Sequence, residues 1–214
     1  MTGQNRFSAV LFDCDGVLVD SETIATQALH ASLQAVGIEI TEHEVAETFT
    51  GHAWPRCIEI IEDMLGQPIP AHFMAHNRQE FERLMHQSLV PMAGVSAVLD
   101  GLHLPFAVVT NSRTQELAMK LEVSGLSPFF PPERRFDAER MGVAKPDPAI
   151  YQRAAQHMGV DIQQCLIIED SYPGLTAGKA SGATVWAYRP AATSEQIERL
   201  NIDLIFHDWS AWPL

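Results

Sequence analysis

Short apolar runs alternate along the chain with segments of helical periodicity. The apolar runs are brief and continuous, which is typical of strands buried on both faces of a parallel sheet. We predict strands at residues 9–12, 106–109, 165–168, 184–188 and 204–206. The alternation predicts an α/β fold with a three-layer, Rossmann-like parallel sheet at its core. In such a sheet, functional groups gather at the carboxyl ends of the strands.

Two helices of this core are predicted from their end signals. Ser112 and Gln115 have the spacing of a capping box, and Gly125 is placed to end the helix that the box would begin. Asp147 and Pro148 suit the N-cap and the first position of a later helix. A cluster at 131–135 is expected to be a surface loop, and Trp209 and Trp212 are expected to anchor the C-terminal tail.

More than 90 residues separate the first two predicted strands, too many for a simple crossover. Residues 22–89 have a helical pattern throughout: apolar stripes predict three helices, and a capping box at Thr41 and Glu44 predicts a further short one. We therefore expect a helical cap domain at 21–90, inserted into a catalytic core of residues 1–20 and 91–214. Its connections would be residues 19–21 and 90–94, which we expect to act as a hinge.

Composition and charge narrow the classes of partner. The chain has 46% hydrophobic and 19% charged residues, as expected for a globular protein. Its formal net charge of −13 argues against binding nucleic acid or anionic membranes. We see no signal-peptide core and no apolar run long enough to span a bilayer, so we expect a cytoplasmic protein. The three isolated cysteines indicate neither a disulfide framework nor a zinc site.

Asp13, Asp15 and Gly16 follow the first predicted strand. Two carboxylates two residues apart can point into one small volume, and the glycine lets the backbone turn. Burying both anions is costly without a cation, and hard oxygen ligands suit Mg²⁺. Taken alone, the motif could also be a simple polar turn after a strand.

Later strand ends add the other parts of a phosphoryl-transfer site. Thr110 and Asn111 close one predicted strand and offer a hydroxyl and N–H donors to a phosphate. Lys145 supplies a fixed positive charge, and Glu169 and Asp170 close another strand with a second carboxylate pair.

With these motifs the sequence resembles the haloacid dehalogenase superfamily, from about residue 9 to residue 188. It is similar to the branch of sugar-phosphate phosphatases and β-phosphoglucomutase-like enzymes that have a helical cap. The contexts at 20–22 and 145–148 resemble bacterial phosphatases that act on sugar phosphates or phosphorylated sugar acids such as 6-phosphogluconate. The resemblance implies a magnesium-dependent phosphatase for a small phosphorylated metabolite, working as a monomer or weak homo-oligomer.

The resemblance also implies roles for these residues. Asp13 would attack phosphorus and become an aspartyl phosphate, while Asp15 would act as general acid and then general base. Asp13 and Asp170 would bind Mg²⁺ through their carboxylates, and Asp15 would bind it through its main-chain carbonyl. The phosphoryl oxygens would be held by a separate set of groups, namely Thr110, Asn111 and Lys145. Glu169 would support the metal site from just outside.

Other chemistry in this superfamily is disfavoured by particular residues. Dehalogenases lack the second aspartate and transport ATPases have threonine there, so Asp15 argues against both. Phosphonoacetaldehyde hydrolases need a cap lysine, and this chain has lysines only at 120, 145 and 179. A β-phosphoglucomutase-like phosphomutase remains the alternative, and a non-catalytic phospho-aspartate regulator is a weaker one.

Specificity in related caps resides in the loop that corresponds to residues 50–56. His52 or Arg56 could contact a second anionic group or sugar hydroxyls, and Trp54 offers a flat face. The competing interpretation is that Trp54 packs within the cap and Arg56 is a solvated helix charge. Fold-level analogy does not decide between these interpretations.

Overall fold

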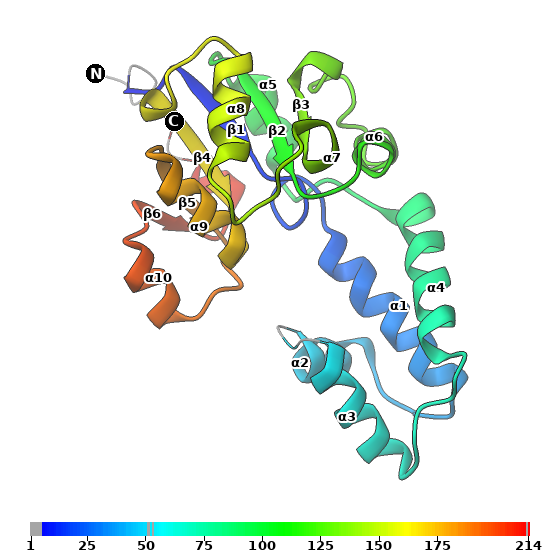
Figure 1. Ribbon diagram of the computed structural model, residues 1–214. Helices are drawn as coiled ribbons and strands as arrows, with labels where there is room; N and C mark the ends of the chain where they lie inside the picture. The colour runs from blue at the N-terminus through cyan, green and yellow to red at the C-terminus, as the bar shows by residue number, and fades with distance from the viewer. Residues whose placement is uncertain (1–5, 51, 53, 213) are drawn as a thin grey trace. The chain divides into compact units, whose positions relative to one another are not determined.

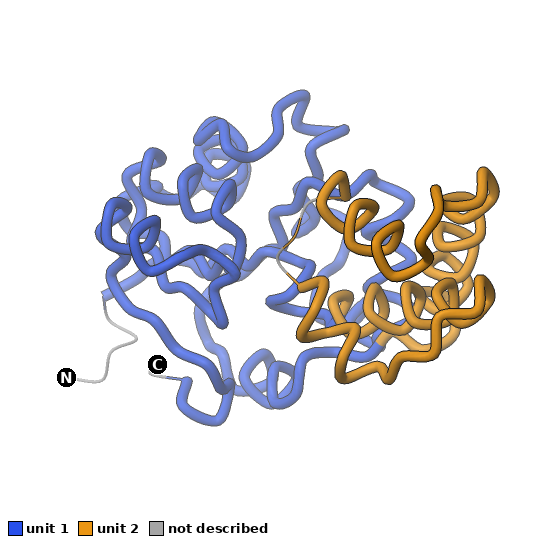
Figure 2. The backbone as a smooth tube through the Cα atoms, turned by 90° about the horizontal axis from the view of Figure 1, so that it is seen from below, with its two compact units in different colours: residues 1–20, 90–214 blue, residues 21–89 orange. Residues whose placement is uncertain are grey.

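The chain forms two compact units, residues 1–20 with 90–214 and residues 21–89 (Figure 2). The structure is a computed structural model, and it describes residues 6–50, 52, 54–212 and 214. The placement of the two units relative to each other is not determined. Within the described residues, no helix is both long and apolar enough to cross a membrane.

The first unit is built on a six-stranded sheet in which every pair of neighbours is parallel. Its strands are β1 (Ala9–Phe12), β2 (Phe106–Thr110), β3 (Arg135–Asp137), β4 (Cys165–Glu169), β5 (Thr184–Tyr188) and β6 (Leu204–Phe206). The strand order is β3-β2-β1-β4-β5-β6, so β1 lies between β2 and β4. Every residue of β1, β2 and β4 is buried, which explains their unbroken apolar runs. The predicted α/β fold class is confirmed.

Helices pack against this sheet (Figure 1). The helices of the unit are α5 (Val95–Gly101), α6 (Thr114–Val123), α7 (Ala138–Met141), α8 (Ala149–His157), α9 (Tyr172–Ser181) and α10 (Ser194–Leu200). Ile150 of α8 and Leu175 of α9 pack with Leu11 and Ile167 of the sheet in one apolar cluster. Alternate side chains of the strands face the opposite side, as a pleated sheet requires.

Aromatic residues near the C-terminus cover that opposite face. Trp209, which begins a short 3₁₀ helix, η4 (Trp209–Ala211), is 1% exposed. Its ring lies 4.8 Å from that of Tyr188 and 6.1 Å from that of Phe12, between ring centroids. Trp212 contacts Trp186 at 5.6 Å. The predicted anchoring of the tail by Trp209 and Trp212 is confirmed.

The second unit consists of four helices with a core of their own. They are α1 (Ser21–Ala35), α2 (Glu42–Phe49), α3 (Trp54–Leu65) and α4 (Phe73–Ser88), and α1 packs along α4 (Figure 1). Leu33, Ile61 and Phe73 are at most 1% exposed and belong to one cluster. This matches the helical pattern of the sequence.

The two chain segments that join the units are paired with each other. Val19 and Pro91 form an antiparallel bridge, flanked by bonds from Asp20 N to Val90 O (3.1 Å) and from Met92 N to Leu18 O (2.9 Å). These bonds use Val90 O as acceptor and Met92 N as donor, the two neighbours of Pro91, so the missing N–H of Pro91 leaves no gap in the ladder. Pro91 is therefore held in the first unit, just beyond the boundary between residues 89 and 90.

Three local predictions need correction. The Ser112 capping box is absent: α6 begins at Thr114, whose N–H donates to Glu139 (3.1 Å), so Ser112 is free for other partners. Pro148, rather than Asp147, is the N-cap of α8. The predicted loop at 131–135 instead holds a 3₁₀ turn, η2 (Pro132–Arg134), and the first residue of β3. Arg135 fixes this segment by donating to Phe130 O (2.6 Å).

Candidate active site

The strand order brings the predicted chemical groups to one edge of the sheet. Asp13 follows β1, Thr110 ends β2, and Asp170 follows β4. Because these three strands are adjacent and parallel, their carboxyl ends lie side by side. The chain runs from β1 to β2 and β3 on one side of β1 and then crosses to β4 on its other side. The carboxyl end of β1 is therefore the topological switch point, where ligands bind in open α/β sheets.

Lys145 joins the carboxylates from β1 and β4. Its ammonium, 3% exposed, donates to Asp13 Oδ1 and, at 2.5 Å, to Glu169 Oε1. Burial lowers the pKa of Lys145, but the charges of Asp13 and Glu169 outweigh that effect and raise it well above its usual value. The lysine therefore stays charged at the centre of the site.

Glu169 is a fully buried carboxylate with both oxygens engaged. Oε1 also accepts from the Tyr151 hydroxyl at 2.7 Å. Oε2 accepts from the N–H groups of Asp170 (3.1 Å) and Ser171 (3.2 Å), and from the Ser171 hydroxyl. Because both carboxylate oxygens of Glu169 already accept hydrogen bonds, this residue is suited to orienting Lys145 and Asp170.

The buried position of the Glu169 carboxylate requires a glycine at position 174. A Cβ added there would lie 1.9 Å from Glu169 Oε1. No side chain larger than hydrogen fits at this distance, so the glycine admits the buried carboxylate beside the first turn of α9.

Asp13 is a buried acid among other acids. Burial raises its pKa, Lys145 opposes that rise, and the charges of Glu169 and Asp15 add to it, giving a pKa of about 7. The largest of these causes is burial, which disfavours the charged form of the carboxyl group.

The donor set fits a divalent cation. Asp13, Glu169 and Asp170 each offer a carboxylate oxygen, and these atoms lie within 4.8 Å of one another. Three carboxylates and the Lys145 ammonium leave a formal charge of about −2, which one divalent ion balances. Oxygen ligands alone favour Mg²⁺ over softer metals.

A glycine at position 16 leaves room for the carboxylate of Asp170 in this cluster. It has a φ of +72°, and a Cβ there would lie 2.1 Å from Asp170 Oδ2. The Asp170 carboxylate therefore packs directly against the backbone that follows Asp15. A side chain at position 16 would fill the space that Asp170 occupies.

Thr110 and Asn111 lie at the same edge. Thr110 is 1% exposed, and its Oγ1 accepts from Ser112 N at 3.1 Å. The side chain of Asn111 bonds to both backbone groups of Lys145: Oδ1 accepts from N at 2.8 Å and Nδ2 donates to O at 3.1 Å. In this structure Asn111 thus fixes the backbone that carries Lys145.

A second ion cluster, which the sequence pattern did not predict, surrounds Asp15. Lys120 of α6 donates to Asp15 Oδ2 at 2.6 Å and to Ser112 Oγ at 2.8 Å, and it pairs with Glu116 at 2.6 Å. Burial lowers the pKa of Lys120, but Asp15 and the other partners raise it above its usual value. Glu116 and Lys120 are four residues apart on α6, so the sequence allows them to pair with each other. No local signal in the sequence places Asp15 or Ser112, which precedes the helix, beside them.

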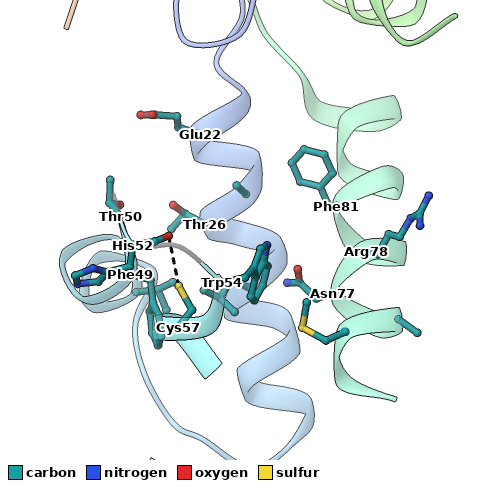
Figure 3. A pocket seen from close by; sticks show the side chains of 15 residues that line it. Glu22, Thr26, Phe49, Thr50, His52, Trp54, Cys57, Asn77, Arg78 and Phe81 are labelled. Carbon is teal, nitrogen blue, oxygen red and sulfur yellow. Dashed lines mark hydrogen bonds between the residues drawn. The ribbon is translucent and has the colours of Figure 1, made fainter. Parts of the chain in front are cut away.

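The helical unit holds a cavity of about 790 Å³, within the size range of small-molecule sites (Figure 3). Aromatic and polar side chains line it, among them Phe49, His52, Trp54, Asn77 and Phe81. Trp54 is 41% exposed, so it is not packed inside the unit as the competing interpretation required. Arg56 is exposed, pairs with Glu59 at 2.8 Å, and is absent from the described lining residues.

Fold and site together define a class of protein: an α/β enzyme with an acidic, lysine-bearing site at the switch point and a helical unit inserted after β1. The sequence pattern of the haloacid dehalogenase-like hydrolases matches residues 7–182, most of the chain. The chain belongs to this family, and the predicted resemblance is confirmed.

Named relatives agree with this assignment. The chain is 31% identical over 185 residues to 6-phosphogluconate phosphatase of Escherichia coli, covering 86% of this chain and 83% of that protein. It is 28% identical to hexitol phosphatase A of the same bacterium, covering 94% and 91%. These relatives support the predicted enzyme class, a phosphatase of this family.

A solved structure shares the fold over nearly the whole chain. It is a hydrolase of the haloacid dehalogenase family from Deinococcus radiodurans, with bound phosphate and sodium. The two chains are 30% identical, with a TM-score of 0.85, and the match covers 97% of this chain and 93% of that one.

Proposed function

We propose that this chain is a magnesium-dependent phosphatase that hydrolyses a small phosphorylated metabolite through a phosphate ester of Asp13. The observation that carries the proposal is the contact of Lys145 with both Asp13 and Glu169 in the cluster that includes Asp170. A fixed cation beside the Asp13 carboxylate supports the role of Asp13 as nucleophile, because the charge of a transferring phosphoryl group would gather there.

In the first step, a carboxylate oxygen of Asp13 attacks phosphorus and the bond from phosphorus to the leaving oxygen breaks. Asp15 gives its proton to that oxygen, so the substrate leaves as a neutral alcohol. Lys145 and the hydroxyl of Thr110 donate to the phosphoryl oxygens. The products of this step are the alcohol, phosphorylated Asp13 and ionised Asp15.

In the second step, a water oxygen attacks the same phosphorus while Asp15 takes one proton from that water. The bond from phosphorus to the Asp13 oxygen breaks, which releases inorganic phosphate. Asp13 is again a carboxylate and Asp15 is again protonated, so the cycle closes without any further reactant.

The residues for the metal are Asp13 and Asp170 through their carboxylates and Asp15 through its main-chain carbonyl. Bound Mg²⁺ supplies positive charge that stabilises the phosphoryl oxygens in the transition state. Glu169 orients this set, since both its oxygens already accept bonds from the protein.

The substrate class that we propose is a sugar phosphate or a phosphorylated sugar acid such as 6-phosphogluconate. The support is the named activity of the two bacterial relatives. We further propose that residues 21–89 act as a cap and that its cavity recognises the leaving group, with His52 as one contact. A phosphomutase would need the same core residues, and no contact among the residues that the structure describes favours it over hydrolysis.

The first test is phosphate release from a panel of phosphorylated metabolites, with and without Mg²⁺. We expect release to need Mg²⁺ and to fall at least about 1,000-fold in Asp13→Asn, because that variant lacks the nucleophile. Asp100→Asn, an exposed aspartate of α5, is the matched control and should retain activity. Isomerised sugar phosphate without phosphate release would replace the proposal with a phosphomutase.

A further inference from the structure

Lys120 is a buried cation that the steps above do not use. Its side chain is 3% exposed. Its ammonium meets Asp15 Oδ2 and Glu116 Oε1, each at 2.6 Å, and Ser112 Oγ at 2.8 Å. An ammonium group has three N–H donors, so these three acceptors saturate it. A buried charge is stable only when it is paired in this way, and the three partners therefore fix its position.

The hydrogen bonds that Asp15 accepts from Lys120 and Ser112 go to the same carboxylate oxygen. Lys120 and the Ser112 hydroxyl both donate to Oδ2, at 2.6 and 3.2 Å. Since the Ser112 oxygen accepts from Lys120, its own proton is available for Asp15. Among the described residues, no hydrogen bond to Oδ1 of Asp15 is present. One oxygen of this carboxylate is thus held by the protein, and the other is left for proton transfer.

We propose that Lys120 is a positioning residue: together with Ser112 it holds Oδ2 of Asp15, so that Oδ1 carries the proton to and from the reacting oxygen. This inference rests on the proposed function, in which Asp15 is the general acid and base. Among the described residues, Lys120 makes no hydrogen bond or ion pair with Asp13, and its three N–H donors are already engaged. A purely structural lysine would tie α6 to the segment after β1 without affecting proton transfer.

Leaving-group dependence separates these two roles. An alkyl phosphate needs a proton on its leaving oxygen, whereas 4-nitrophenolate departs readily without one. In Lys120→Met, kcat/KM for the best alkyl phosphate of the panel should fall about 10- to 100-fold, but less than about 3-fold for 4-nitrophenyl phosphate. Lys179→Met, which removes the lysine paired with Asp203 at 2.9 Å, is the matched control and should change neither value. Equal losses on both substrates in Lys120→Met would overturn the inference.

Asp15→Asn separates failure of this inference from failure of the proposed function. If Asp15→Asn leaves kcat/KM for the alkyl phosphate intact, the general-acid role itself is wrong. If Asp15→Asn lowers that value and Lys120→Met does not, only the positioning role is wrong. Where both lower it, the double variant should lose no more than Asp15→Asn alone, and additive losses would contradict positioning. Should Lys120→Met fail to fold by circular dichroism, Ser112→Ala provides the same comparison of substrates.

Discussion

His52 and Arg56 lie close in sequence, yet the structure gives them different surroundings. His52 lines the cavity of the helical unit, whereas Arg56 is exposed and paired with Glu59. We therefore expect His52→Ala to lower kcat/KM for the preferred substrate by about 10-fold, and Arg56→Ala by less than about 2-fold. Steady-state kinetics on the metabolite panel would measure both, with 4-nitrophenyl phosphate as a reference that lacks the natural leaving group.

The opposite ranking would contradict this assignment. If Arg56→Ala carried the larger loss, the recognition group would lie on the outer face of α3 rather than in the cavity. A similar loss in both variants on 4-nitrophenyl phosphate would indicate damage to the helical unit instead of lost recognition.

Some of these individual residues could be predicted from the sequence, and others could not. Asp13 and Asp170 could be predicted because each follows a recognisable strand, and adjacent parallel strands bring their ends together. Lys120 could not, because it lies mid-helix and reaches Asp15 only through the packing of α6 in the folded unit. Trp54 required the structure because its exposed fraction depends on tertiary packing.

At the scale of helices and strands, the side-chain carboxylate of Asp203 links α9, β5 and β6. Asp203, just before β6, accepts from Val185 N of β5 at 2.8 Å and from Lys179 of α9 at 2.9 Å. Partial burial raises the pKa of Asp203, but these two hydrogen bonds outweigh it, so the net pKa is lower than usual. A carboxylate with a lowered folded-state pKa stabilises the fold above its unfolded pKa of about 3.9, and this stability is lost as pH falls through the folded value.

We expect Asp203→Asn to lower the free energy of unfolding by less than about 1 kcal/mol near neutral pH, because the group is partly exposed and its ion pair is screened. Asparagine keeps an acceptor for Val185 N–H and removes only the charge. Urea unfolding at about pH 7 and about pH 3.5 would test this: the difference from wild type should shrink at the lower pH. A difference that grew on acidification would show that the lowered pKa is wrong.

Element boundaries show where local signals fail. Strands β1 and β4 could be placed from their apolar runs, whereas the three-residue β3 lies beside Pro131 and Pro132 and carries no such run. The capping box at Ser112 had the right spacing, but Glu139 from α7 satisfies the start of α6 and Ser112 bonds to Asp15. Partners from elsewhere in the fold thus replaced the local capping interaction that the spacing had predicted.

For the whole molecule, charge sets the approach of the substrate. A phosphomonoester is anionic and the chain has a formal net charge of −13, so at long range the two repel. Near the site, Lys145 and bound Mg²⁺ would attract it, but over a shorter distance and partly offset by the surrounding carboxylates. Salt screens the long-range repulsion between exposed charges more than the contacts inside the buried cluster.

We therefore expect kcat/KM to rise, by about 2- to 5-fold, as ionic strength increases from about 10 mM to about 150 mM at saturating Mg²⁺. Potassium chloride and choline chloride should give the same rise, since screening depends on ionic strength and not on the cation. A fall with both salts would mean that the local positive charge of the site extends far enough to steer the substrate despite the acidic surface. A response to potassium alone would indicate that the ion binds at a specific place instead of screening the whole molecule.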